Sequence, residues 1–175
     1  MKKKILALVV TSLFFSQSCD EVNNLLTFTI ENETEFTIEN QFPVETPITV
    51  PTPDISSNSS ESFENNNTSA QFVEEITLHQ LALTITSPED FTFSFLKSIK
   101  IYISAEGEER VMIASLEDVP EDAVTIDLET RSQNLKPYII RDTYNLEYEI
   151  VARETFANDI TLRTDMVFKV KANPL

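Results

Sequence analysis

The residue with the most definite chemistry in this chain is Cys19. It is the one cysteine of 175 residues. It follows three lysines at the start of the chain, an apolar run over residues 5–15 and the small polar segment Ser16-Gln17-Ser18. A positive start, a short apolar run and small residues are typical of a secretory signal, and this run is too short to span a bilayer as a helix. We therefore predict a signal peptide over residues 1–18, which places Cys19 at its end.

Residues for most other site chemistry are scarce. His79 is the single histidine and Gly107 the single glycine. A metal site built on several imidazoles is therefore excluded, and a Ser-His-Asp triad would have to use His79 as its base. A glycine-rich phosphate loop is excluded by the glycine count. We expect His79 to lie at a bulge or on the surface, and we predict no catalytic residue, no cofactor and no metal site.

Acidic side chains are abundant and form two clusters in the sequence. The first contains Glu106, Glu108 and Glu109, and the second contains Glu117, Asp118, Glu121 and Asp122. Calcium loops alternate carboxylates and contain a glycine, and neither feature is present in the second cluster. Solvated loops are the favoured interpretation. A glycosidase needs a defined pair of carboxylates, and no pair among so many acids is singled out by spacing.

Charge sets the class of partner. The chain has 13 Lys+Arg and 29 Asp+Glu, and loss of the three signal lysines would take the net charge from −16 to about −19. Nucleic acids and anionic lipid surfaces are bound through clustered Lys and Arg, so both are poor partners for this chain. The length that remains suits one domain with one core.

The first part of the expected domain alternates apolar and polar residues. Leu26, Phe28 and Ile30 share one face of a strand, and Phe36 and Ile38 repeat the pattern after a polar connection over residues 31–35. We expect two half-buried strands that form a hairpin. Four prolines in residues 42–53 keep that segment at a sheet edge or outside the sheet. The Ser/Asn-rich residues 54–70 are expected to form a loop, either flexible or pinned by Ile55 and Phe63.

Further alternation indicates strands from residue 72 onward. The apolar face changes near His79-Gln80, which predicts a bulge, and Gly107 suits a hairpin position with positive φ. Residues 131–143 predict one short helix, with Pro137 in its first turn. By parity, Tyr148 faces inward and Tyr102 is exposed or half covered. The expected inward sets are Phe91, Phe93 and Phe95; Ile99, Ile101 and Ile103; Val124, Ile126 and Leu128; Leu146, Tyr148 and Ile150; and Leu162, Met166, Phe168 and Val170.

These patterns predict an all-β fold. We expect residues 25–175 to form one antiparallel β-sandwich of about seven to nine strands with one short helical crossover. The three phenylalanines at residues 91–95 most simply fill the core, and the alternative is that they line an apolar cavity between the sheets.

Several segments resemble a family of uncharacterised lipoproteins of Bacteroidota, particularly flavobacteria. They are Cys19 with its preceding residues, Phe28–Asn32 and Phe36–Asn40, Asn65–Ser69, Leu83–Pro88 and Phe95–Ile103. The resemblance implies an outer-membrane lipoprotein lipidated at Cys19, with residues 19–24 as the acylated tether, and it implies no activity. Asp20 and Glu21 are similar to the acidic stretch that sends some of these lipoproteins to the cell surface, whereas in enterobacterial lipoproteins an aspartate in that place resembles an inner-membrane retention signal. We expect an outer-membrane position, with the domain facing either the periplasm or the cell surface. The alternative is ordinary cleavage near Ser18 with an incidental cysteine.

Three functions remain open at this point. The favoured one is a membrane-anchored, non-enzymatic β-domain that binds or scaffolds an envelope protein. The first alternative is a carrier of an apolar ligand inside the sandwich. The second is a hydrolase that uses scattered carboxylates.

Overall fold

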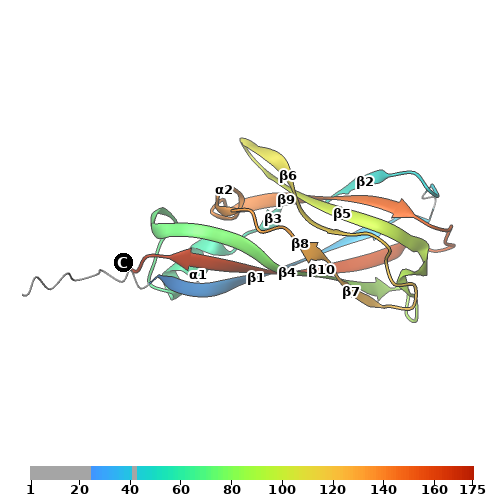
Figure 1. Cartoon of the computed structure of the whole chain (residues 1–175), viewed down its shortest axis with the longest axis horizontal. Helices are drawn as coiled ribbons and strands as arrows, with labels where there is room; N and C mark the ends of the chain where they lie inside the picture. The colour runs from blue at the N-terminus through green and yellow to red at the C-terminus, as the bar shows by residue number, and fades with distance from the viewer. Residues whose placement is uncertain (1–24, 41–42) are drawn as a thin grey trace, which may run out of the picture.

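The computed structural model describes residues 25–40 and 43–175. The predicted signal peptide and the tether that contains Cys19 lie outside the described residues. What the structure describes is an elongated sandwich of two β-sheets (Figure 1).

The prediction of an all-β antiparallel sandwich is confirmed, with ten strands rather than seven to nine. One sheet has the order β1-β10-β4-β7, and the other has the order β2-β9-β5-β6-β8, with β3 paired to β9. The strands are β1 (Leu26–Ile38), β2 (Ile48–Pro51), β3 (Ile55–Ser56), β4 (Val73–Ser87), β5 (Leu96–Ala105), β6 (Glu108–Leu116), β7 (Thr125–Asp127), β8 (Glu129–Thr130), β9 (Thr143–Ala152) and β10 (Ile160–Ala172). The helices are α1 (Ser59–Asn65) and α2 (Lys136–Ile139), with 3-10 turns η1 (Ala70–Phe72) and η2 (Phe93–Phe95).

The hairpin expected over residues 26–38 is wrong. These residues form the single 13-residue strand β1, which pairs with β10 along its whole length without a register shift. The apolar residues on both sides of the polar segment are even-numbered, so one continuous strand keeps them all on the inward face. Inside the polar segment, Asn32 and Thr34 continue that inward face, and Asn32 is buried.

Two tyrosines of β9 explain why polar residues face inward there. The hydroxyl of Tyr144 accepts a hydrogen bond of 3.0 Å from Asn32 Nδ2 of β1. The hydroxyl of Tyr148 lies 2.7 Å from the Thr164 hydroxyl of β10, and both side chains are buried. The Tyr148 ring also stacks on Phe36 with centroids 3.8 Å apart. The two sheets are therefore joined across the core by hydrogen bonds as well as by apolar contact, because a buried phenol needs a polar partner.

The bulge predicted in β4 is present. Gln80 pairs with Val167 and Leu78 pairs with Phe168, so His79 has no register partner, and its side chain is exposed. The extra residue lets the residues on both sides of it face one core. Gly107 has the expected positive φ, 79°, in the β5–β6 hairpin.

Phe91, Phe93 and Phe95 do not lie on a strand, contrary to the prediction. They belong to the connection 88–95, which ends in η2 and carries the chain from the sheet of β4 to the sheet of β5. Phe93 and Phe95 are nevertheless fully buried and Phe91 is partly buried. The phenylalanines close one end of the core because the chain must cross between the layers there.

The strand predicted from Val124, Ile126 and Leu128 is also divided between the sheets. β7 pairs with β4 in one sheet and β8 pairs with β6 in the other. Ile126 and Leu128 are buried, whereas Val124 is 45% exposed. A segment that changes layers cannot keep a single inward parity along its length.

The Ser/Asn-rich segment is pinned to the domain and contains regular structure that the composition did not predict. Ile55 and Phe63 are buried, and Phe63 lies in α1, where its ring contacts Phe28 edge to face at 6.3 Å. The short helix predicted within 131–143 is confirmed as α2, with Pro137 in its first turn. Tyr138 and Ile139 of α2 are buried, and so is Leu135, which directly precedes the helix. Within the described ranges, no helix has the length and apolar character needed to cross a membrane.

Candidate functional site

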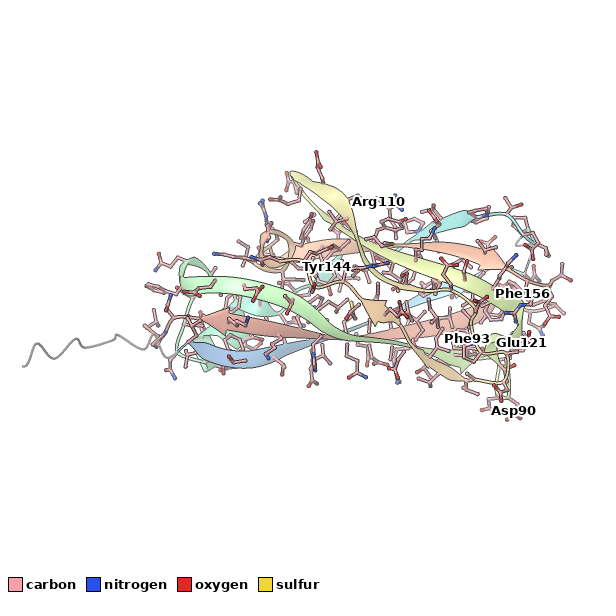
Figure 2. All side chains as sticks on the ribbon, in the orientation of Figure 1. Asp90, Phe93, Arg110, Glu121, Tyr144 and Phe156 are labelled. Carbon is pink, nitrogen blue, oxygen red and sulfur yellow. The ribbon has the colours of Figure 1, made fainter. Side chains whose placement is uncertain are left out.

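Four connections meet at one end of the sandwich, and we call them together the acidic end. They are the described residues of 39–47, and residues 88–95, 117–124 and 153–159. Backbone contacts join them: Glu45 N–H bonds the Ala152 carbonyl, and Phe93 N–H bonds the Ala123 carbonyl, each at 2.9 Å. The labelled residues Asp90, Phe93, Glu121 and Phe156 mark this end in Figure 2. Loops at one end of a rigid sandwich are where binding residues commonly lie.

Arg153 holds three of these connections together. Its guanidinium donates hydrogen bonds to the carbonyls of Ser94 and Val119, each at 3.4 Å, and forms an ion pair of 2.7 Å with Glu121. Its backbone N–H donates to the Phe95 carbonyl. The planar guanidinium suits this role because it presents several donors in a fixed geometry.

Aromatic rings form the floor of the acidic end. Phe95 and Phe156 meet edge to face with centroids 5.1 Å apart, and Phe93 lies 6.1 Å from Phe95. Val119, within the connection 117–124, is 2% exposed. The loops therefore rest on the core, and this contact limits the conformations open to their exposed side chains.

The exposed surface of the acidic end carries a large excess of negative charge. The four connections contain ten carboxylates and one cation, Arg153; the acids are Glu39, Glu45, Glu89, Asp90, Glu117, Asp118, Glu121, Asp122, Glu154 and Asp159. Glu45 pairs with Lys97 of β5 and Glu121 pairs with Arg153, and the other eight have no ion-pair partner among the described residues. Such a surface attracts cationic partners and raises their rate of association.

Replacing Arg153 by methionine is expected to loosen the acidic end. The loss of its charged hydrogen bonds should lower the free energy of unfolding by about 1–3 kcal/mol, and Arg153→Lys should fall between methionine and arginine. Hydrogen exchange should show faster opening of residues 88–95 and 117–124, with β10 protected as before. Uniformly faster exchange throughout the chain, or no change in these two connections, would contradict this role.

The sequence candidates are spread over the molecule. The structure places the first acidic cluster on the β5–β6 hairpin, at the opposite end from the connections just described, where Glu108 pairs with Arg141 at 2.8 Å. The second cluster, around Glu117, lies within the acidic end. Tyr102 is half covered by Arg110, whose guanidinium carbon lies 3.6 Å from the ring centroid. In the part of the chain that the structure describes, no group of three His, Cys, Asp or Glu is placed to hold a metal ion.

Apart from the two clusters seen in the sequence, further carboxylates lie on the outer face of the four-stranded sheet. Glu33 of β1 and Asp165 of β10 are register partners, and with Glu31 they line a depression of about 300 Å³. Arg163 pairs with Asp165 at 3.0 Å, and this hydrogen bond raises the pKa of Arg163. Adjacent strands bring these acids together, so their spacing in the sequence did not reveal them.

Sequence reasoning missed Arg153 and the inward polar residues Asn32 and Thr164. The apolar residues at positions 26–38 are all even-numbered, and this pattern could have indicated that Asn32 also faces inward. The one cation within long acidic connections was a signal for Arg153, although only the fold shows which connections it joins.

No family model and no curated protein matches this chain. Among solved structures, one of Desmodium yellow mottle tymovirus is similar over 100% of this chain and 98% of that chain, at 15% identity and a TM-score of 0.32. Two structures of turnip yellow mosaic virus each match over 86% of this chain and 96% of the other, at 13% and 15% identity with TM-scores of 0.26 and 0.29. Likeness at this level carries no argument about function.

Proposed function

We propose that this chain is an outer-membrane lipoprotein of the Bacteroidota type, anchored through lipidated Cys19. In this proposal, its β-sandwich is a non-enzymatic domain that binds or scaffolds a basic envelope protein at the acidic end. The observation that supports it most is that the start of the described domain and the acidic end lie at opposite ends of the sandwich.

The register of β1 with β10 places the two features at opposite ends. Leu26 at the start of β1 lies opposite Ala172 near the end of β10, whereas Ile38 and Ile160 meet beside the acidic end. In Figure 1 the C-terminus is at the left and the connections of the acidic end are at the right. Since β1 has 13 residues, the two ends are about 40 Å apart. A tether from Cys19 to Leu25 reaches at most about 20 Å, so a lipid anchor would place the acidic end away from the membrane.

Charge supports a protein partner with basic residues. Carboxylates without ion-pair partners repel phosphate backbones and anionic headgroups and attract Lys and Arg. The acidic end also has a fixed framework, because Arg153 and the aromatic floor hold its connections. A preorganised surface loses less conformational entropy when a partner binds.

Packing of the described core favours surface binding over the carrier alternative. Inward side chains of both sheets are in mutual contact across the core, as the Phe36–Tyr148 stack and the Tyr144–Phe168 contact at 6.3 Å illustrate. Phe91, Phe93 and Phe95, which could have lined a cavity between the sheets, instead close the end of this core. Surface binding therefore has the stronger structural basis.

Charge reversal at the acidic end tests the proposal. The triple variant Glu89→Lys, Asp122→Lys and Glu154→Lys changes three exposed residues without ion-pair partners among the described residues. We expect at least tenfold lower recovery of envelope proteins crosslinked to the membrane-bound protein in its own cells, judged by quantitative mass spectrometry.

The matched control applies the same charge change at the other end of the molecule. Glu64→Lys, Glu106→Lys and Glu109→Lys alter three exposed acids there and should leave the crosslinked set unchanged. Equal losses in both triple variants would show that net charge alone matters, and the assignment of binding to the acidic end would be abandoned.

A further inference from the structure

The free edge of β1 is an independent feature of the molecule, separate from the acidic end. β1 is the first strand of its sheet and pairs only with β10 in the sheet order. Among the described residues, no backbone hydrogen bond outside that ladder involves residues 26–38. A strand paired on one side has a second row of N–H and C=O groups on the other side, and such a row can pair with another extended chain.

The other sheet edges are shorter or protected. β2 has four residues and ends in Pro51, β7 has three residues and β8 has two. β1 has 13 residues, contains no proline and keeps an unbroken register with β10. Bulges, prolines and short length are the usual means of blocking edge pairing, and β1 has none of these.

The protection that β1 does have is charge, and that charge specifies a partner. Glu31, Glu33 and Glu35 point to the outer face, are exposed and have no ion-pair partner among the described residues. In an added antiparallel strand, residues directly opposite them lie on the same face and within contact distance. Opposite charges at these positions stabilise pairing, and like charges oppose it.

A second copy of this chain is therefore a poor occupant. Antiparallel pairing of two β1 strands centred on Glu33 would place Glu33 against Glu33 and Glu31 against Glu35. Shifting the register by two residues still places glutamates against one another. Repulsion among Glu31, Glu33 and Glu35 disfavours self-association through β1, whereas a strand with basic residues would be attracted.

We propose that the free edge of β1 pairs with an extended segment of another protein that has Lys or Arg at three alternate positions. The basic side chains lie beside Glu31, Glu33 and Glu35, and the backbone extends the four-stranded sheet. The intervening side chains face inward, toward half-buried Phe28 at one end. At the other end, a depression of about 220 Å³ between Thr37 and residues of β2, including Ile48 and Val50, provides further apolar contact.

A designed peptide tests this pairing directly. The probe is a nine-residue peptide with lysines at three alternate positions and valine or threonine between them, titrated into the protein at low salt. We expect binding with slower amide exchange in β1, measured by NMR. A peptide of the same composition with its lysines consecutive should bind at least tenfold more weakly. Equal affinity for the two peptides, or no detectable binding of the alternating one, would overturn the proposal.

Charge-reversed variants locate the site. Glu31→Lys, Glu33→Lys and Glu35→Lys together should abolish binding of the lysine peptide and create binding of its glutamate counterpart. The variant with Glu64, Glu106 and Glu109 changed to lysine has the same net charge, lies outside both proposed binding surfaces and should bind the lysine peptide as the parent does. Loss of binding in both variants would show attraction by net charge and would refute a site on β1.

Backbone pairing is tested separately from charge. Two forms of the lysine peptide carry N-methyl groups, one on each alternate set of residues. The backbone N–H groups of one set point toward β1, and those of the other set point toward solvent. Methylation of the first set should therefore abolish binding, and methylation of the second should leave it unchanged. Retention by both forms would rule out strand pairing. Because these measurements need no membrane and no natural partner, they are independent of the test of the acidic end.

Discussion

Replacing Tyr148 by alanine is expected to lower the free energy of unfolding by about 3–5 kcal/mol, the range for large aromatic truncations in protein cores. The side chain is fully buried on β9, stacks on Phe36 of β1 and bonds Thr164 of β10. Its removal leaves a cavity between the sheets and also leaves the Thr164 hydroxyl without its partner. Urea unfolding followed by circular dichroism measures the loss.

Conservative variants separate the hydrogen bond from the packing. Tyr148→Phe keeps the ring and should lower the free energy of unfolding by about 1–3 kcal/mol, because buried Thr164 Oγ1 is left unpaired. Adding Thr164→Val removes that polar group and should recover part of the loss. If the double variant is destabilised by the sum of the two single changes, the bond between the sheets contributes nothing and this account is wrong.

The same residue gives a pH signature. Burial raises the pKa of Tyr148 well above its ordinary value, and the hydrogen bond to Thr164 opposes this only in part. The unfolded chain releases the phenol proton at about pH 10, whereas the folded chain retains it. The contribution of Tyr148 to the free energy of unfolding should therefore be constant below about pH 10 and fall as the pH rises further. In Tyr148→Phe the free energy of unfolding should fall less steeply in this range.

Replacing Cys19 by serine is expected to release the protein from the membrane almost completely. Each buried methylene of an acyl chain contributes about 0.8 kcal/mol, so two or three chains make attachment effectively permanent, and serine accepts no thioether-linked lipid. Fractionation of cells followed by immunoblotting should move the protein from the outer-membrane fraction to the soluble fraction. Intact-mass measurement of the parent protein should show the added acyl mass.

The control for this change is Ser18→Ala, which keeps the thiol and a small residue before it. This variant should remain in the membrane fraction. Retention of Cys19→Ser in the membrane after a high-salt wash, or a parent mass that corresponds to an unmodified chain, would favour ordinary cleavage near Ser18 and remove the lipid anchor from the proposal.

Residue alternation predicted the fold well where a strand stays in one layer. Ile99, Ile101 and Ile103 of β5 are all fully buried, as expected, and so are Phe168 and Val170 of β10. The exposed bulge at His79 was also predictable, because the apolar residues change from even to odd positions at that point of the sequence. Each of these features depends on residues close together in the chain and on the two-residue period of a strand.

Prediction failed where distant residues set the environment. Asn32 and Thr34 look like a polar connection until Tyr144 from the other sheet supplies a hydrogen bond to Asn32. Phe93 and Phe95 have strand spacing but lie in a crossover between layers. The same alternation fits a hairpin or one long strand at residues 26–38, and a strand or a crossover at residues 91–95. Contacts across the sandwich decide between the two structures in each case.

The candidate sites divide in the same way. The sequence by itself determined the strongly acidic charge, the scarcity of histidine and glycine, and the prediction of a lipid anchor at Cys19, because composition and a linear signal need no fold. Only the tertiary structure gathered four connections at one end of the sandwich, three of them joined by Arg153, and left the glutamates of β1 on an edge with no partner strand among the described residues. Strand pairing between distant segments sets which loops meet and which strand is outermost, and these pairings depend on packing of the whole core rather than on any local pattern.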